Sequence, residues 1–472
     1  MLRTIVEKEI RDLIGSTKFA ITFGACAVLI IAAFYAGAAR YHLYRNQYDA
    51  SREQVHRQVR ANTDWNAVGE AIAFLPPDPL ATLVSGVSND IGRTAIVRGR
   101  GEPTVQDSRF SEDPIYAVFQ FLDLEFLFKV ILSLFAILLG YDAISGEKEQ
   151  GTLRLSFANA LPRHTYIVGK LLGSSALLGA SLLIALIAGA VLLPIMAVPM
   201  SGGHWLSLFL IVLTGFLYFG VFLTLSVGVS ALTQRSSSSF LVMLVIWIAC
   251  VLIIPRVAVL TAGRAVEVPS VDEIASQIAR YATQLRDEYF DALNDMSITM
   301  AGAEGDPIQK LNQYMDSLTN VRQSKMDELS GRLNERRHNA QERQSHLALG
   351  LARLSPTASL TLAISHLAGT SLALSERFHQ DALEYSRTFG EFKRAKTGFN
   401  SGASVRMIRI HDGAPQEEAE RIDPGEMPRF EFKPQSTLEA LAASAVDIGL
   451  LAFFNILFFA GAFVTFARYD VR

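Results

Sequence analysis

The chain has 472 residues, of which 50% are hydrophobic and 19% are charged, with a formal net charge of −3. Soluble globular domains carry about 25% charged residues, so the composition argues against an ordinary soluble protein. The sequence contains no basic block, which argues against nucleic-acid binding. Its two cysteines, Cys26 and Cys250, lie in apolar stretches, so we expect small buried hydrophobes rather than a disulfide framework.

The first segment, residues 1–18, has the pattern of an amphipathic helix. Ile5, Ile10 and Leu13 can share one face, and basic residues such as Lys8 surround that face. A helix with this distribution is typical of a membrane interface. We therefore predict an interfacial helix that leads into the membrane.

Six later stretches are long and apolar enough to cross a bilayer, which takes about 20 residues in a helix. The predicted spans are residues 19–39, 119–140, 171–197, 206–232, 238–255 and 445–467. The stretch 347–374 is also apolar, but Arg353 and His366 interrupt it and an odd number of spans would export the basic C-terminus. The predicted fold is an all-α polytopic membrane protein with six transmembrane helices.

The short loops indicate the orientation, since Lys and Arg accumulate on the cytoplasmic side. The N-terminus, the loop 141–170, the loop after the fourth span and the C-terminus all carry basic residues, whereas residues 199–204 carry none. We therefore expect a multi-pass protein of the bacterial inner membrane with both termini in the cytoplasm. Residues 40–118 and 256–444 are then two periplasmic insertions.

The second insertion is predicted to be mainly helical. From Ile308 onward, apolar residues recur at alternating steps of about three and four, the pattern of a helical hairpin or coiled coil. Ser355 followed by Pro356 reads as a helix cap with proline at the first helical position. The first insertion is predicted to continue the first span as a helix, followed by a short mixed region, and residues 397–437 look irregular.

The loop 141–170 between spans two and three is the most informative segment. Acidic residues follow the end of the second span, and a turn at Gly151 and Thr152 separates them from a short apolar run that begins at Leu153. We expect two short helices at the membrane surface, able to dock on a soluble partner and pass its movement to the spans on either side.

This loop resembles the coupling-helix loop of ABC-2 type permeases. The residues that carry the resemblance are Asp142, Ile144, Ser145, Glu147, Lys148, Glu149, Gly151, Thr152, Leu153, Pro162, Arg163, Gly169 and Lys170. The stretch from Leu354 to Arg387 also resembles the subgroup with two large periplasmic insertions, to which the permeases of nitrous-oxide-reductase maturation and gliding motility are distantly similar.

The resemblance implies a half-transporter. It would pair with a second permease, identical or related, and with two copies of an ABC ATPase, in lipid. ATP and Mg would be bound by the ATPase, and Glu147 or Glu149 would lie near basic residues of its nucleotide-binding domain. No cofactor or metal is expected on this chain, and no catalytic residue.

The chain itself lacks the motifs of an ATPase. A P-loop places glycines and a Lys-Ser/Thr pair at fixed spacing around the phosphates. The nearest match, residues 86–94, is one residue too long and has Arg93 in place of Lys. We therefore expect a non-catalytic subunit.

The second span carries an acid and a base, Glu125 and Lys129, four residues apart on one helix face. One interpretation is an interfacial ion pair whose lysine reaches toward the headgroups. The other is a pair that faces the permease–permease interface on a transport pathway.

Two functions fit the sequence. The first is an ATP-driven export permease. The second is a mechanotransmission machine that moves its insertions against a periplasmic partner without translocating a substrate, which the size of the second insertion favours. A secondary transporter is less favoured because we see no paired inverted repeats, and a sensor would need a cytoplasmic output domain.

Overall fold

The computed structural model describes most of the chain. The described residues are 2–62, 64–65, 67–88, 91–99, 103–106, 123–158, 162–299, 307–397 and 422–468. They form two compact units: one holds the described residues up to 256, from 352 to 397 and from 422 to 468, and the other holds 257–299 and 307–351. The predicted start of the second span at 119–122 and most of the irregular stretch 397–437 lie outside the described residues.

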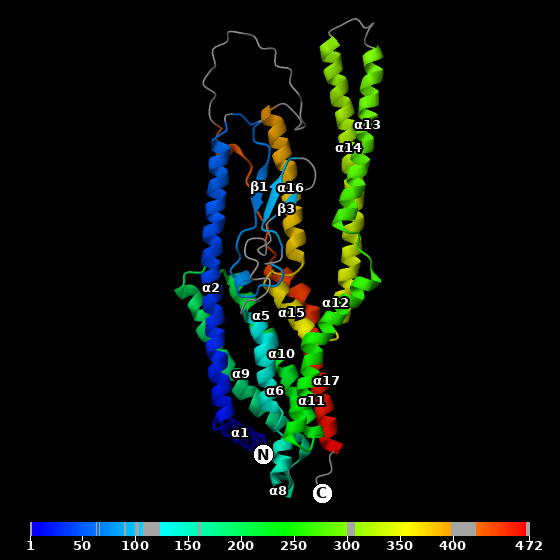
Figure 1. Ribbon diagram of the computed structural model, residues 1–472. Coiled ribbons are helices and arrows are strands. Elements are labelled where there is room, and N and C mark those ends of the chain that lie inside the picture. The colour runs from blue at the N-terminus through cyan, green and yellow to red at the C-terminus, as the bar shows by residue number, and fades with distance from the viewer. Residues whose placement is uncertain are drawn as a thin grey trace. The chain divides into compact units, whose positions relative to one another are not determined.

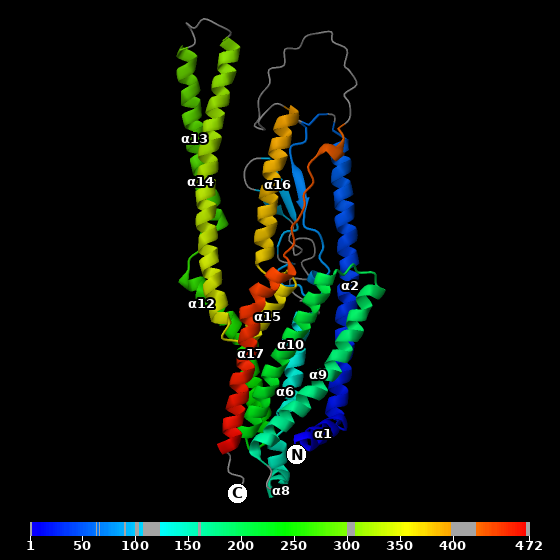
Figure 2. The ribbon, with the colours of Figure 1, turned by 180° about the vertical axis from the view of Figure 1, so that it is seen from behind.

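The first unit is built around a bundle of long helices (Figures 1 and 2). Within the described ranges, six helices are long and apolar enough to cross a membrane, and they are Thr17–Arg60, Leu124–Glu149, Arg163–Ile195, Gly202–Leu232, Ser236–Ala265 and Thr437–Arg468. This confirms the prediction of an all-α polytopic membrane protein. Both described chain ends lie at the same end of the bundle (Figure 1).

Four of these spans are single helices and two are composite. The single ones are α2 (Thr17–Arg60), α9 (Arg163–Ile195), α10 (Gly202–Leu232) and α17 (Thr437–Arg468). The second span comprises α5 (Leu124–Phe126), the π-helical turn η2 (Leu127–Leu132), α6 (Ser133–Gly140) and, after a turn, α7 (Ser145–Glu149). The fifth comprises α11 (Ser236–Ile248), the π-helical turn η3 (Ala249–Ile253) and α12 (Ile254–Ala265).

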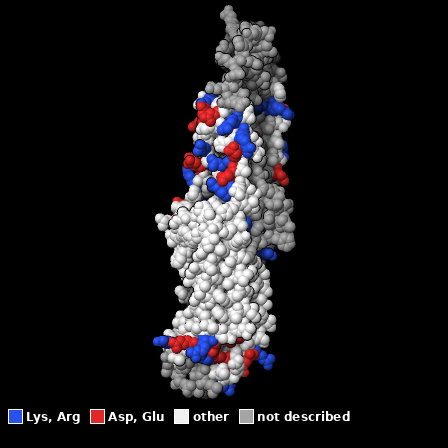
Figure 3. All heavy atoms as spheres, turned by 90° about the vertical axis from the view of Figure 1, so that its left-hand side faces the viewer, with Lys and Arg blue, Asp and Glu red and all other residues white. Residues whose placement is uncertain are grey.

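The surface of the bundle carries a broad band without charges. On the face that contains α2 and α9, the band separates charged side chains at one end from a second charged region beyond it (Figure 3). We call the end with α1 (Leu2–Ile14), α7 and α8 (Thr152–Ala158) the loop end, and the opposite end of the bundle the insertion end. An uncharged band of this kind is what hydrocarbon requires, because a charge at the bilayer centre costs several kcal/mol.

Helix α10 lies at the centre of the bundle and packs against α6, α15 (Pro356–Leu367) and α17. Its aromatic side chains Tyr218 and Phe222 are fully buried, as are Phe34 from α2 and Phe128 from η2. Between membrane helices such side chains stabilise the bundle through close van der Waals packing, because the lipid tails around the bundle are as apolar as the side chains themselves. The contacts of α10 therefore join most of the other spans into one core.

Helix α1 packs lengthwise on α9 rather than standing apart from the bundle. The contact is close because α9 presents glycines: a Cβ at Gly169 would lie 2.7 Å from Ile5, and one at Gly173 would lie 2.9 Å from Glu9. The amphipathic pattern of residues 1–18 is thus explained by one face that covers α9. Glu9 points into this contact and is buried.

At the insertion end, a small antiparallel sheet interrupts the helical architecture. Strands β1 (Ala71–Phe74), β2 (Thr94–Val97) and β3 (Thr104–Gln106) pair in the order β1-β2-β3, with Ala71 opposite Val97 and Thr94 opposite Gln106. Helix α16 (Ala373–Thr397) packs on β2. The sequence predicted only a mixed region here, and the sheet was missed because its strands are three or four residues long.

Helix α15 is a 12-residue helix that belongs to the first unit and packs on α10 and α17. The predicted cap is confirmed, since the Ser355 hydroxyl accepts a hydrogen bond from Thr357 N and Pro356 occupies the first turn. Arg353 and Asp447 form a bidentate ion pair, with Nε to Oδ1 at 2.7 Å and Nη2 to Oδ2 at 3.0 Å. The charge of Arg353, which argued against a seventh span, joins the segment before α15 to α17.

The second unit consists mainly of α13 (Val271–Thr299) and α14 (Pro307–Ala352), which lie side by side (Figures 1 and 2). Lys325 Nζ lies 3.3 Å from Glu288 Oε2, and the guanidinium of Arg322 lies 5.1 Å from the ring centroid of Tyr289. The predicted helical hairpin is confirmed. Arg322, which interrupts the apolar stripe in the sequence, makes a cation–π contact with the other helix.

Candidate functional site

The three charged residues of the Glu147-Lys148-Glu149 run reach four neighbouring helices, because Glu147 contacts α9 and α1, Lys148 contacts α10 and Glu149 contacts α11. Glu147 is bound by a cluster that we call the Glu147–Lys170 cluster, made of Lys8, Glu9, Glu147, Tyr166 and Lys170. Lys170 Nζ lies 3.1 Å from Glu147 Oε1 and 3.0 Å from Glu9 Oε2, and the Tyr166 hydroxyl donates to Glu147 Oε2 at 2.5 Å. Lys8 Nζ lies 3.6 Å from Glu147 Oε1.

Most of this cluster is withdrawn from solvent. The side chains of Lys170, Glu9 and Glu147 are 7%, 11% and 14% exposed, whereas that of Lys8 is 59% exposed. A buried charge requires a partner, because desolvation costs several kcal/mol per ion. The cluster satisfies this requirement by placing one buried ammonium between two carboxylates, which ties α7 to α9 and α1.

The other two residues of the run bind the ends of adjacent spans. Lys148 Nζ donates to the carbonyl oxygens of Ala231, at 2.5 Å, and Thr233, at 2.9 Å, at the C-terminal end of α10. The Glu149 carboxylate accepts from Ser236 N at 3.1 Å and from Ser236 Oγ at 2.9 Å, at the start of α11. A cation at a helix C-terminus and an anion at an N-terminus both complement the helix dipole. The run therefore holds the connection between spans four and five.

The residues just before the run fix the start of α7. Ser230 on α10 accepts hydrogen bonds through its hydroxyl from the backbone N–H groups of Ile144, at 3.0 Å, and Ser145, at 2.9 Å. Lys18, near the start of α2, lies 2.6 Å from Asp142 Oδ2. The α7 helix is thus attached to α2 and α10 before its charged residues begin.

The turn between α7 and α8 depends on Gly151, whose φ of +73° lies in the left-handed region that glycine adopts without strain. Thr152 Oγ1 donates to the carbonyl of Glu147 at 3.3 Å. Leu153 is 2% exposed and packs in an apolar cluster with the loop-end parts of α9, α10 and α17. The predicted turn and apolar run therefore fold back onto the bundle.

The second half of the loop leads into α9. Pro162 occupies the N-cap position of α9, and Arg163 Nη1 donates to the carbonyl oxygen of Ala467 near the end of α17 at 2.6 Å. Both residues are exposed. Together, these contacts bring every predicted site residue of the loop to the loop end of the bundle.

The sequence did not reveal which other residues of this chain bind the loop residues. The main ones are Lys18, Glu9, Tyr166, Ser230 and Ser236. One signal was available for Glu9, because a carboxylate four residues from Ile5 falls on the apolar face of an amphipathic helix. Tyr166 lies one turn before Lys170 on α9. For Ser230 and Ser236 the sequence held no comparable signal.

The second predicted pair lies at the insertion end. Lys129 Nζ and Glu125 Oε1 are 3.9 Å apart, and Glu125 Oε1 also accepts from Thr361 Oγ1 of α15 at 2.8 Å. The side chains of Glu125 and Lys129 are 15% and 34% exposed. The acid is therefore held by a second helix as well as by the lysine.

The start of α15 contributes to holding both π-helical turns. Its Thr357 acts through the Tyr218 hydroxyl, and Ser355 just before it acts directly. The carbonyl of Lys129 in η2 accepts from the Tyr218 hydroxyl at 3.1 Å, and that hydroxyl shares a 3.0 Å hydrogen bond with Thr357. The carbonyl of Cys250 in η3 accepts from Ser355 Oγ at 2.5 Å. A π turn leaves carbonyls without their usual helical partner, so the start of α15 stabilises both irregular turns.

Comparison with known protein families identifies the family of the chain. The family model described as ABC-2 family transporter protein matches residues 3–471. The chain belongs to the ABC-2 transporter family. No curated protein matches it significantly. As an ABC-2 membrane protein with several apolar helices, the chain has the features of a permease subunit rather than of a catalytic one.

Among the described residues, no group of three or more His, Cys, Asp or Glu side chains is placed so that it could hold a metal ion. At its loop end, this ABC-2 family protein presents a charged segment that contacts α2, α9, α10 and α11.

Proposed function

We propose that this chain is the permease subunit of an ATP-driven exporter of the inner membrane, and that its α7–α8 segment receives the movement of a separate ATPase. The observation that supports the proposal is the way in which Glu147, Lys148 and Glu149 bind different helices. Each residue of the run is attached to a different span connection: α9 with α1, the end of α10, and the start of α11. A push on α7 would therefore reach all of them at once.

The carboxylates of Glu147 and Glu149 are engaged within this chain, so they act here as internal attachments. Among the described loop residues, the exposed surface that an ATPase could contact includes Gln150, Gly151, Arg154, Arg163 and His164, together with Glu149, which is exposed although it caps α11. This surface is polar and partly basic, and it lies at the turn where α7 meets α8. The ATPase would bind ATP and Mg, and two ATPase copies with a second permease would complete the assembly.

A site-specific photo-crosslinker tests the docking. A crosslinking amino acid in place of Gln150 should attach the ATPase when the complex is expressed in its native host. The same amino acid in place of Arg45, an exposed residue on the insertion-end half of α2, should not. Equal crosslinking from both positions, or none from Gln150 in a complex that is otherwise intact, would contradict the proposal.

A second function is supported by helix α2. It runs without interruption from Lys18, which contacts Asp142 in the loop, to Val59, which is buried in the apolar cluster around the sheet. Such a helix can move the insertion end directly, which is what mechanotransmission without translocation requires.

The two functions predict different effects of ATP on the protein. Mechanotransmission predicts an ATP-dependent change in the distance between spin labels at Arg52 on α2 and Leu206 on α10, with no ATP-dependent uptake of a labelled substrate by sealed inverted vesicles. Such uptake would favour export and contradict the alternative.

A further inference from the structure

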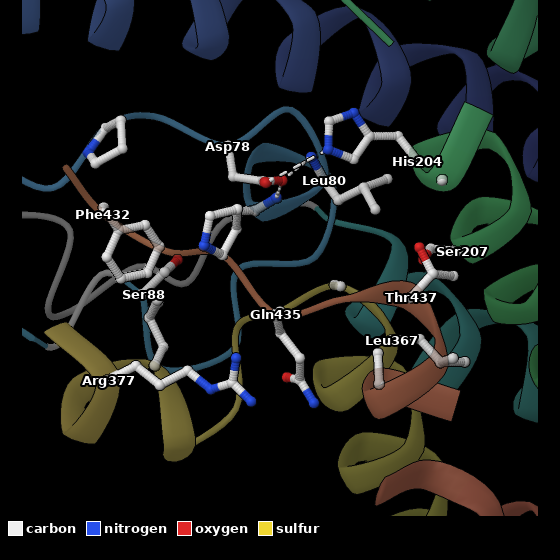
Figure 4. Close-up of a pocket in the computed structure, with 18 of the residues that line it drawn as sticks. Asp78, Leu80, Ser88, His204, Ser207, Leu367, Arg377, Phe432, Gln435 and Thr437 are labelled. Carbon is white, nitrogen blue, oxygen red and sulfur yellow. Dashed lines mark hydrogen bonds and ion pairs between the residues drawn. The ribbon is translucent and has the colours of Figure 1, made fainter. Parts of the chain in front are cut away.

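A cavity of about 430 Å³ opens at the insertion end of the first unit. Five segments meet around it (Figure 4). They are residues 75–88, the start of α10, the end of α15, the start of α16 and the segment before α17. This volume falls within the range of small-molecule sites, about 300–1,000 Å³. The cavity lies far along the bundle from the α7–α8 segment and takes no part in the coupling contacts.

One part of the cavity wall is apolar. It is formed by Leu75, Leu80, Leu367, Leu374 and Phe432, which come from four separate segments. Such a lining binds an apolar body by removing it from water, and it has little affinity for a small inorganic ion.

The polar part of the lining contains positively charged groups, which would attract an anion. Arg377 of α16 extends its guanidinium into the cavity (Figure 4), and Arg93 also lines it. The cap residues of two long helices, Ser201 before α10 and Ser436 before α17, lie in the same wall. The start of a long helix carries a partial positive charge. Arg377 and the starts of α10 and α17 therefore line one space, while the Arg93 guanidinium lies over the Tyr44 ring, 4.5 Å from its centroid.

The carboxylate in the lining is already engaged. Asp78 Oδ1 accepts from the backbone N–H groups of Leu80 at 2.7 Å and Ala81 at 3.4 Å, and its Oδ2 lies 3.7 Å from His204 Nε2. His204 Nδ1 accepts from Ser201 N at 3.2 Å, so its other ring nitrogen carries a proton and faces Asp78.

Arg377 has one acidic partner, Glu439, whose carboxylate lies 3.2 Å from Nη2 and does not line the cavity. The Glu439 side chain is 59% exposed. Exposed pairs of this kind contribute about 0–1 kcal/mol, so a ligand anion can compete with Glu439 for the guanidinium, while Glu439 keeps its 3.4 Å hydrogen bond from Ser436 N at the start of α17. Figure 4 places Arg377 and Asp78 on different sides of the cavity.

We propose that this cavity binds an anionic amphiphile, with a carboxylate or phosphate held by Arg377 and an apolar body against the leucines and Phe432. The level of the cavity along the bundle also fits this ligand. The lining residues Ser201 to Ser207 and Ser436 to Ala440 lie where the apolar parts of α10 and α17 begin, which is the level at which the head of an amphiphile sits in a membrane. The proposal is independent of the ATPase.

The experiment uses the full chain in amphipol and a dansyl-labelled undecanoic acid as the probe. Trp205 follows His204 directly and is 39% exposed, so energy transfer from it to the dansyl group reports occupancy, and Trp205→Phe should reduce that signal. The acid is expected to bind at least fivefold more tightly than its methyl ester, which has the same apolar body and no charge.

Two variants and one control complete the test. Arg377→Gln should weaken binding of the acid at least fivefold and leave binding of the ester unchanged, whereas Arg387→Gln, at an exposed position further along α16, should leave both unchanged. Ala81→Trp, which fills the cavity, should weaken both ligands. If acid and ester bind equally and neither Arg377→Gln nor Ala81→Trp changes the affinity of a folded protein, the proposal is overturned.

The source of the amphiphile is decided by competition. If phosphatidylglycerol in nanodiscs displaces the probe and phosphatidylcholine does not, the site takes an anionic membrane lipid. If neither lipid displaces it and a soluble unlabelled fatty acid does, the site takes a free amphiphile. Displacement by phosphatidylcholine as strong as by phosphatidylglycerol would contradict recognition of the anion.

Discussion

The ammonium group of Lys170 lies between two carboxylates that come from different helices, 3.1 Å from Glu147 Oε1 on α7 and 3.0 Å from Glu9 Oε2 on α1. The lysine belongs to α9, so a single cation joins three helices at the loop end. One buried ammonium therefore serves as the partner of both nearly buried carboxylates.

Replacement of Lys170 by Met should lower the free energy of unfolding by about 3–5 kcal/mol, because it leaves two carboxylates without their buried cation. Thermal or denaturant unfolding of the purified protein measures the change. Lys8→Gln is the matched control: its ammonium lies 3.6 Å from the same Glu147 and is 59% exposed, so we expect a loss of about 0–1 kcal/mol. Equal losses in both variants would contradict the role assigned to Lys170.

Replacement of Glu149 by Ala should release the first turn of α11, since its carboxylate accepts from both the backbone and the hydroxyl of Ser236. Loss of a helix cap costs about 0.5–2 kcal/mol. Hydrogen exchange at the amide of Ser236 should become faster, by roughly tenfold for 1.4 kcal/mol. Gln150→Ala, at the adjacent exposed position, should leave that exchange rate unchanged, and a similar acceleration there would argue against capping.

Replacement of Arg353 by Gln should destabilise the contact between α17 and the segment before α15. Asp447 is fully buried and receives two hydrogen bonds from the guanidinium, and these bonds raise the pKa of Arg353. An unpaired Asp447 should cost about 3–5 kcal/mol, seen as a lower melting temperature. Glu384→Gln breaks an exposed pair with Lys433 and should change stability by less than about 1 kcal/mol.

Stability should depend on pH through His366. Burial lowers the pKa of this imidazole, with the nearby Arg353 acting in the same direction and Asp447 opposing it. The folded protein then binds fewer protons than the unfolded chain at pH values just below the ordinary histidine pKa of about 6.5, so stability rises with pH in that window and is lost as the pH falls.

The variant His366→Gln cannot be protonated in this range. The difference in melting temperature between pH 5 and pH 7 should therefore be smaller in the variant than in the parent protein. A variant with an unchanged pH dependence would show that other groups cause it.

The long apolar stretches and the loop motif made the architecture predictable, because the cost of burying charge in hydrocarbon leaves a strong signal in any sequence. The partners of the motif were not predictable. Glu149 and Ser236 are 87 residues apart, and nothing local to either residue indicates that the end of one span will meet the start of another.

The roles of the two acids illustrate the same limit. The family resemblance implied that Glu147 or Glu149 lies near basic residues of a partner ATPase. In the structure, the carboxylate of Glu147 is nearly buried beside Lys170 and Tyr166. Which side of a five-residue helix faces the bundle depends on tertiary packing, and such a short helix has too few residues to show a periodicity.

Helix α2 contains 44 residues in one uninterrupted helix. At about 1.5 Å per residue its length is about 66 Å. A tilt of about 5° around the Lys18–Asp142 contact would move its far end by about 6 Å over that length. If α2 tilts as a rigid rod, a change of a few degrees in its angle at the loop end becomes a displacement of about one helix turn beside the β-sheet.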